Sequence, residues 1–151
     1  MRRLALLLLL AGCGTAHEGE EKETANGHNQ TAPARAAAPP SPEDLAMSRA
    51  AAATVGRYYD HVGRREWRAA FALREPGPGV TFERFVASFE RYADYRATVG
   101  VPSPPAREGE AAWVQVPVQL YGRMRDGSSF GSVGTVTLKR SAEQGNWRIV
   151  S

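Results

Sequence analysis

The spacing of apolar residues in this chain changes near Tyr95, and that change limits the fold to a helical part followed by a sheet. Between about residues 41 and 94, apolar side chains recur at intervals of three and four, which is the period of an amphipathic helix. From Tyr95 onward they alternate with polar side chains, which is the period of a half-buried strand. Helices that all precede the strands predict an α+β domain.

Three helices are expected in the first part. The sequence Ser41-Pro42-Glu43-Asp44 is typical of a helix start, because serine caps the helix, proline suits its first turn and acidic residues complement its dipole. We expect this helix to end near Val62, a second helix over Arg65–Arg74, and a third that follows Thr81. Their inward faces consist of Leu45, Val55, Tyr58, Tyr59 and Val62, then Trp67, Ala70 and Phe71, then Phe82, Phe85, Val86 and Phe89.

Four strands are expected in the second part, over Tyr95–Val101, Ala112–Arg123, Phe130–Arg140 and Trp147–Ser151. Asp126-Gly127 is a hairpin turn signal, so consecutive strands should pair antiparallel. Pro117 cannot donate a hydrogen bond to a neighbouring strand, which predicts a sheet edge or a bulge at that residue. The arrangement is three N-terminal helices packed on a four-stranded antiparallel sheet.

Four segments resemble the nuclear transport factor 2-like superfamily, the cone-shaped fold shared with polyketide cyclases and ketosteroid isomerases. They are Val55 with Tyr58-Tyr59, Glu66-Trp67 with Ala70-Phe71, the strand Val114–Val118, and the closing Trp147-Arg148-Ile149. The resemblance covers nearly all of residues 45–151. It implies a curved sheet that wraps the long helix and leaves a pocket at the wide end of the cone.

A candidate pocket follows from that fold. Its lining would be Tyr58, Tyr59, Trp67, Phe71, Phe85, Phe89, Val116, Val118 and Trp147. Aromatic side chains at helical or alternating spacing are more often plain core than ligand wall, so both interpretations stay open. Arg57, Arg64, Arg65 and Arg68 predict a solvated helix face rather than an anion site.

No catalytic residue is assigned. Enzymes of this fold place an acid or a histidine on an apolar wall, and the candidates here are Asp60, His61 and Asp94, with Tyr58 or Tyr59 as hydroxyl donor. Gly127-Ser128-Ser129-Phe130-Gly131 matches the nucleophile-elbow pattern, but the serine opens a strand and no histidine follows it. One histidine and no free cysteine in the domain predict neither a metal site nor a cofactor.

The N-terminus carries a second signal, for export and lipid attachment. Met1-Arg2-Arg3 precedes the apolar run Leu4–Ala11, which is far shorter than the roughly 20 residues of a membrane-spanning helix. Leu10-Ala11-Gly12-Cys13 resembles the lipobox of bacterial lipoproteins. The resemblance implies that residues 1–12 are a removed signal peptide and that Cys13 receives a diacylglycerol; the alternative is a plain secretory signal.

Residues 13–44 are predicted to be a disordered tether. Between Gly14 and Pro40 the composition contains no aromatic or large aliphatic residue, so too little apolar area is available to offset the entropy of ordering. The domain at 45–151 carries 15 basic and 10 acidic residues, which would attract it weakly to an anionic membrane. Its charges are spread along the chain, so nucleic acid is not an expected partner.

These features predict a lipid-anchored, extracytoplasmic binding or docking module of the bacterial cell envelope, on the outer membrane where two membranes exist. Its partner would be an envelope protein or a small apolar molecule, and relatives of this fold suggest homodimers that pair through the sheet. The alternatives are a small isomerase- or cyclase-type enzyme and a spacer without a ligand. A docking module should have a filled cone and an exposed apolar patch near Trp113 and Tyr121.

Overall fold

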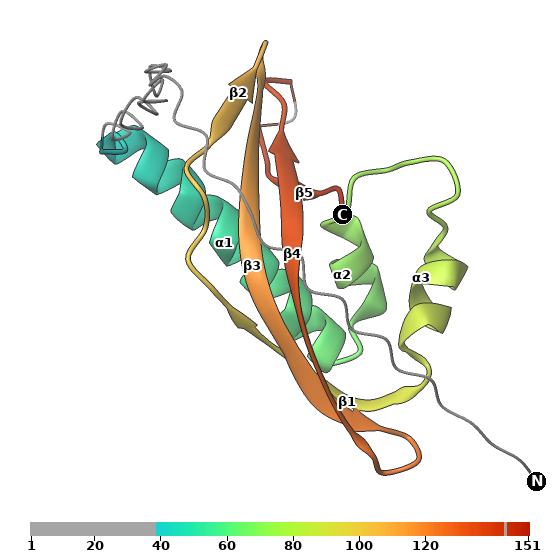
Figure 1. Cartoon of the computed structure of the whole chain (residues 1–151). Coiled ribbons are helices and arrows are strands. Elements are labelled where there is room, and N and C mark those ends of the chain that lie inside the picture. Colours follow the sequence, from blue (N-terminus) through green and yellow to red (C-terminus); the bar gives the residue numbers. More distant parts are fainter. Residues whose placement is uncertain (1–38, 144) are drawn as a thin grey trace, which may run out of the picture. The chain divides into compact units, whose positions relative to one another are not determined.

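The computed structural model describes residues 39–143 and 145–151 of the chain (Figure 1). The expected signal peptide, the lipidation residue Cys13 and the tether up to residue 38 lie outside the described residues. Within the described part, no helix is both long enough and apolar enough to cross a membrane.

Three helices come first in the chain, as predicted. Helix α1 spans Pro42–Gly63, α2 spans Trp67–Ala72 and α3 spans Phe82–Phe89. The backbone N–H of Asp44 donates to the Ser41 hydroxyl at 3.0 Å, so the predicted N-terminal cap of α1 is present. Helix α2 is shorter than the expected Arg65–Arg74, because the chain turns at Arg65 with a φ of 60° and leaves the helix again at Leu73.

The sheet contains strands β1 (Tyr92–Val99), β2 (Ala106–Glu108), β3 (Ala111–Met124), β4 (Ser129–Arg140) and β5 (Arg148–Ile149). Its order is β1-β3-β4-β5, with β2 also paired to β3, and every pair of strands is antiparallel. Strand β3 is therefore central, and the long β3–β4 hairpin turns at the predicted Asp126-Gly127 (Figure 1).

Three details of the sheet differ from the prediction. Strand β1 begins at Tyr92, three residues before Tyr95, and the short strand β2 lies in a segment that the sequence predicts to be loop. Pro117 lies in the central strand and not in an edge strand. Its carbonyl accepts from the N–H of Gly100 just beyond the last β1 pair, so the proline occupies the gap between β1 and β2 and removes no hydrogen bond of either ladder.

One face of the sheet packs against the helices. Alternate residues of β3 and β4 are buried on that face, in agreement with the predicted period of two: Val114, Val116, Val118, Val136 and Leu138. They form a single cluster with the buried face of α1, which consists of Met47, Ala51, Val55, Tyr58 and Val62. This is the predicted α+β architecture of three helices on a curved antiparallel sheet, with β2 as an addition.

Candidate functional site

Aromatic rings pack together between the C-terminal half of α1, helix α3 and the sheet. Phe85 is the centre of this group, because its ring centroid lies 5.4 Å from Phe71, 5.2 Å from Phe89 and 6.3 Å from Tyr58. Trp67 stacks on Phe89 with centroids 5.6 Å apart. Trp67 and Phe89 border a hollow of about 10 Å³, which is about the space of one water molecule. Tyr58, Phe85 and Phe89 border a separate open groove of about 300 Å³.

The aromatic group is larger than the predicted pocket lining. Tyr92, Tyr95 and Phe130 continue it along the sheet, with ring centroids 4.7 to 5.3 Å apart. Among the predicted lining residues, Val116, Val118 and Trp147 lie in the core, and Trp147 also forms part of the wall of a different cleft. The structure joins six of the nine residues in one packed aromatic group: Tyr58, Tyr59, Trp67, Phe71, Phe85 and Phe89.

Burial in this group raises the pKa values of the tyrosines. The pKa of Tyr58 is raised by burial, against the opposing effect of the Arg74 guanidinium. Burial, together with the neighbouring Tyr92 and Tyr58, raises the pKa of Tyr95 to about 12. The pKa of Tyr59 is raised further for the same reason. These hydroxyl groups therefore stay protonated at neutral pH and can donate hydrogen bonds, but cannot act as bases.

Two of the three candidate acid–base residues share a groove. Asp60 and Asp94 line a groove of about 410 Å³ between α1 and β1, together with Tyr59, Tyr95 and Arg96. Asp94 forms an ion pair with Arg96 at 3.1 Å, and Asp60 is exposed. His61 does not line this groove. Its Nδ1 instead lies 2.5 Å from the Glu66 carboxylate. In the described residues no group of three or more metal-binding side chains occurs.

The four predicted solvent-facing arginines have different surroundings. Arg65 donates to the carbonyl groups of Tyr92 and Ala93, which ties the α1–α2 turn to β1. The Arg68 guanidinium lies over the Phe82 ring, and Arg64 borders the groove with Asp60. Arg57, together with Thr54, borders a cleft that has no acidic residue in its lining.

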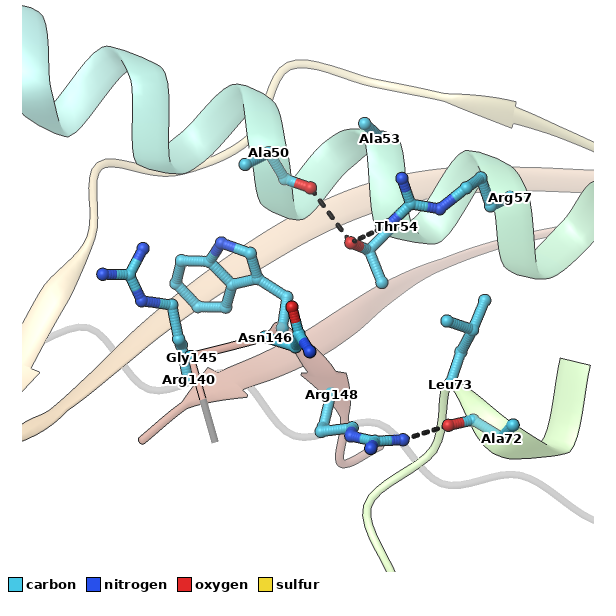
Figure 2. Close-up of a pocket in the computed structure, with 11 residues that line it drawn as sticks. Ala50, Ala53, Thr54, Arg57, Ala72, Leu73, Arg140, Gly145, Asn146 and Arg148 are labelled. Atoms are coloured by element: carbon cyan, nitrogen blue, oxygen red, sulfur yellow. Dashed lines mark hydrogen bonds between the residues drawn. The ribbon is translucent and has the colours of Figure 1, made fainter. Parts of the chain in front are cut away.

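That cleft lies between α1 and β5 and has a volume of about 540 Å³ (Figure 2). Thr54 and Arg57 of α1 line one side, and Arg140, Asn146 and Arg148 line the other. Its apolar lining consists of Ala50, Ala53, Ala72, Leu73 and Trp147. The sequence analysis gives no functional role to Arg140 or to Arg148, although Arg148 lies in the closing Trp147-Arg148-Ile149 segment, because only the β4–β5 pairing brings the two arginines toward α1.

The outer sheet face is the side of β1, β3 and β4 that points away from the core. Val133 is 81% exposed and Tyr121 is 40% exposed on this face, whereas Trp113 is half-buried below the Lys139 ammonium group, 5.3 Å from the ring centroid. Cross-strand pairing places Gln119 beside Val133 and Thr135 beside Pro117. The middle of the face therefore has no charged residue.

Comparison with solved structures identifies the fold. The chain is similar to a nuclear transport factor 2-like superfamily protein from Salmonella enterica, with a TM-score of 0.53 and 15% sequence identity over 70% of this chain and 87% of that one. The fold is the nuclear transport factor 2-like cone. No protein-family model and no curated protein sequence matches the chain.

Other solved structures with this fold are described as proteins of different kinds. A candidate scytalone dehydratase from Novosphingobium aromaticivorans has a TM-score of 0.50 at 12% identity, over 70% of this chain and 80% of that one. The beta subunit of a candidate aromatic-ring-hydroxylating dioxygenase from the same organism has a TM-score of 0.52 at 11% identity, over 69% and 84% of the two chains. At such identities the similarity defines the fold and does not transfer an activity.

Proposed function

We propose that this protein is a lipid-anchored docking module of the bacterial cell envelope, and that its outer sheet face binds another protein molecule. The observation that carries the proposal is the composition of that face. Its centre contains Val133 and Pro117 among threonine and glutamine side chains, whereas Tyr121 and its register partner Arg96 lie toward one end and Lys139 lies toward the other. Protein interfaces have this pattern of a centre depleted in charge inside a polar rim.

The exposure of Val133 supports binding at this position. An isolated valine on a surface needs no explanation, but Val133 lies diagonally across from Pro117 and Tyr121, which flank its register partner two residues to either side, and none of the three is buried. The strands β3 and β4 also form a long, regular and rigid platform, paired from Ala112–Arg140 to Arg123–Ser129. A partner would bind such a platform without having to order it first.

The packing of the aromatic rings favours a protein partner over a small apolar molecule. The hollow beside Trp67, Phe89 and Tyr95 has a volume of only about 10 Å³. Tyr58, Phe85 and Phe89 also border an open groove of about 300 Å³, which is at the lower end of the usual size of a ligand pocket. Arg74 and Arg84 line the same groove, so it suits a small apolar molecule less well than the outer sheet face suits a protein.

The position of the domain at the membrane is part of the same proposal. Lipid attached to Cys13 would hold the protein at the envelope, because two or more acyl chains give stable anchoring where one does not. Replacing Cys13 by serine should release the protein from the membrane fraction into the soluble fraction. Continued sedimentation of the Cys13→Ser protein with membranes would refute lipid attachment.

Site-specific crosslinking in intact cells tests the docking face. A photoreactive amino acid at Val133 should give a defined crosslinked product, and the same amino acid at Glu83, on the exposed side of α3, should not. Val133→Arg, which changes an exposed side chain and should not affect folding, should abolish crosslinking from a probe at Thr135. A product of twice the chain mass identifies a homodimer through the sheet, and a heavier or lighter product identifies another envelope protein.

Equal crosslinking from Val133 and Glu83, or none from either, would contradict the proposal. The alternative function is an enzyme of the isomerase or dehydratase type that uses Asp60 or Asp94 with the Tyr59 hydroxyl. The docking proposal is preferred because Asp60 is exposed and Asp94 is paired with Arg96, whereas a general acid or base at neutral pH usually needs a desolvated carboxyl group.

A further inference from the structure

We propose that the cleft between α1 and β5 binds a phosphate-bearing ligand through Arg57, Arg140 and Arg148. This site is separate from the outer sheet face, and the inference does not depend on the docking function. The three arginines come from α1, from the end of β4 and from β5, and all three line the cleft. Figure 2 shows Arg140 on one side and Arg57 on the other, with Arg148 directed toward Ala72.

The charge of the cleft is not balanced within the described residues. No aspartate or glutamate is among the lining residues, and none of the three arginines forms an ion pair with a described side chain. By contrast, Arg96 and Arg107 elsewhere in the domain each pair with an acid. Like charges that share one concavity repel each other, so an anion in the cleft would relieve this repulsion.

The hydrogen bonds within the cleft orient the guanidinium groups and leave donors unused. Nη2 of Arg57 donates to the Thr54 hydroxyl at 3.1 Å, and that hydroxyl donates to the Ala50 carbonyl at 3.0 Å. Nη1 of Arg148 donates to the Ala72 carbonyl. A guanidinium group has five N–H donors, so each arginine keeps donors for a ligand after these bonds are formed.

Trp147 provides a reporter for the cleft. Its side chain lines the cleft, and the residue is only 6% exposed. The indole Nε1 atom is buried and has no acceptor among the described residues, so its N–H is not occupied by another hydrogen bond. A phosphate bound in the cleft would change the surroundings of the indole ring.

Phosphate fits this set of donors better than a carboxylate. A phosphate monoester has three terminal oxygens and a charge between −1 and −2 near pH 7, which three guanidinium groups can share. A single carboxylate has two oxygens and is satisfied by one bidentate arginine. The volume of about 540 Å³ and the apolar lining of Ala50, Ala53 and Leu73 leave room for a nonpolar part attached to the phosphate.

Indole NMR resonances offer a direct test with the full chain, purified in a non-ionic, phosphate-free detergent. The chain has three tryptophans, so the Trp147 indole signal can be assigned with a Trp147→Phe variant. Inorganic phosphate and phenyl phosphate should shift this signal saturably and leave the Trp67 signal in place. Phenyl phosphate should bind more tightly than inorganic phosphate, and potassium chloride at equal ionic strength should have no such effect.

Matched variants distinguish binding at this cleft from a general effect of the positive charge of the protein. Arg57→Gln and Arg140→Gln should each weaken phosphate binding about tenfold or more, since each removes charge-assisted hydrogen bonds. Arg123→Gln removes the same charge from the exposed end of β3 and should leave the affinity within about twofold. Equal weakening by Arg123→Gln, a shift that does not saturate, or tighter binding of benzoate than of phenyl phosphate would each overturn the proposal.

Vesicles distinguish the two sources of a phosphate group. Binding to phosphatidylglycerol vesicles that is lost in Arg57→Gln and Arg140→Gln, without binding of the soluble phosphates, would identify a lipid headgroup as the ligand. Binding of the soluble phosphates with the same arginine dependence would identify a small molecule. Vesicle binding that is unchanged in both variants, with no response to soluble phosphate, would refute the site.

Discussion

Replacing Gly122 by alanine would test whether the close approach of β1 and β3 holds the sheet in its register. Gly122 pairs with Tyr95, next to the irregularity between Tyr92 and Asp94 in β1. Its φ is 154°, and a Cβ atom at this position would lie 2.2 Å from the carbonyl oxygen of Asp94. The same atom would lie 3.0 Å from the Phe130 ring.

The expected loss of stability follows from these distances. Ordinary contacts of a Cβ atom begin near 3.4 Å, so the backbone of β1 would have to move by more than 1 Å. Overpacking of this kind costs about 1 to 3 kcal/mol, and a backbone conformation that favours glycine adds about 1 kcal/mol or more. A total of about 3 kcal/mol corresponds to a fall in Tm of roughly 10 °C or more for a domain of this size.

Gly134 provides the matched control, because a Cβ atom there would meet nothing within 4 Å and it lies in the neighbouring strand β4. Gly134→Ala should leave the free energy of unfolding unchanged or raise it by about 0.4 to 1 kcal/mol. Urea unfolding followed by circular dichroism measures both variants. A Gly122→Ala protein within about 1 kcal/mol of the parent, or equal losses in the two variants, would refute the steric argument.

Three further predictions concern stability. Leu138→Ala, at a fully buried position, should lower the free energy of unfolding by about 2 to 5 kcal/mol, whereas Val133→Ala should change it by less than about 0.5 kcal/mol in the same urea titration. Ser41→Ala removes the cap of α1 and should cost about 1 kcal/mol, seen as a lower urea midpoint. Because burial raises the tyrosine pKa values above the ordinary 10.0, the folded state favours the protonated tyrosines; stability should be complete below pH 10 and should fall as the pH rises toward 12, less steeply in Tyr95→Phe.

The fold was predictable where a repeated local pattern determined it. The alternation from Val114 to Val118 gave the buried face of β3, and Ser41-Pro42 with acidic residues in the first turn gave the start of α1. The start of β1 was not predictable from the same patterns, since Phe89, Tyr92 and Tyr95 continue a spacing of three that also suits a helix. The chain leaves the helix there because these rings pack on each other and on Phe130 across the sheet, which is a tertiary effect.

The candidate site was predictable only in part, for a similar reason. Residues on one helix face, such as Tyr58 and Tyr59, are related by local spacing, and their aromatic character was visible in the sequence. The arginine cleft joins Arg57 to residues more than 80 positions later through the β4–β5 pairing, and no local pattern relates them. From the sequence alone Arg57 is therefore expected to be solvated, whereas in the structure it lines one side of this cleft.

The two proposed surfaces meet at one place in the sheet, and this makes their coupling testable. Lys139, at the end of the outer sheet face, is the register partner of Arg148, which lines the cleft. Two register pairs join β5 to β4, and further backbone hydrogen bonds join Thr137 of β4 to Val150 and Ser151, so a change at the cleft has a short path to the outer sheet face. If phosphate strengthens docking, docking must strengthen phosphate binding by the same factor, because the coupling free energy is reciprocal. Crosslinking from Val133 that is unaffected by saturating phosphate would mean that the β4–β5 junction is rigid and that the two surfaces act independently.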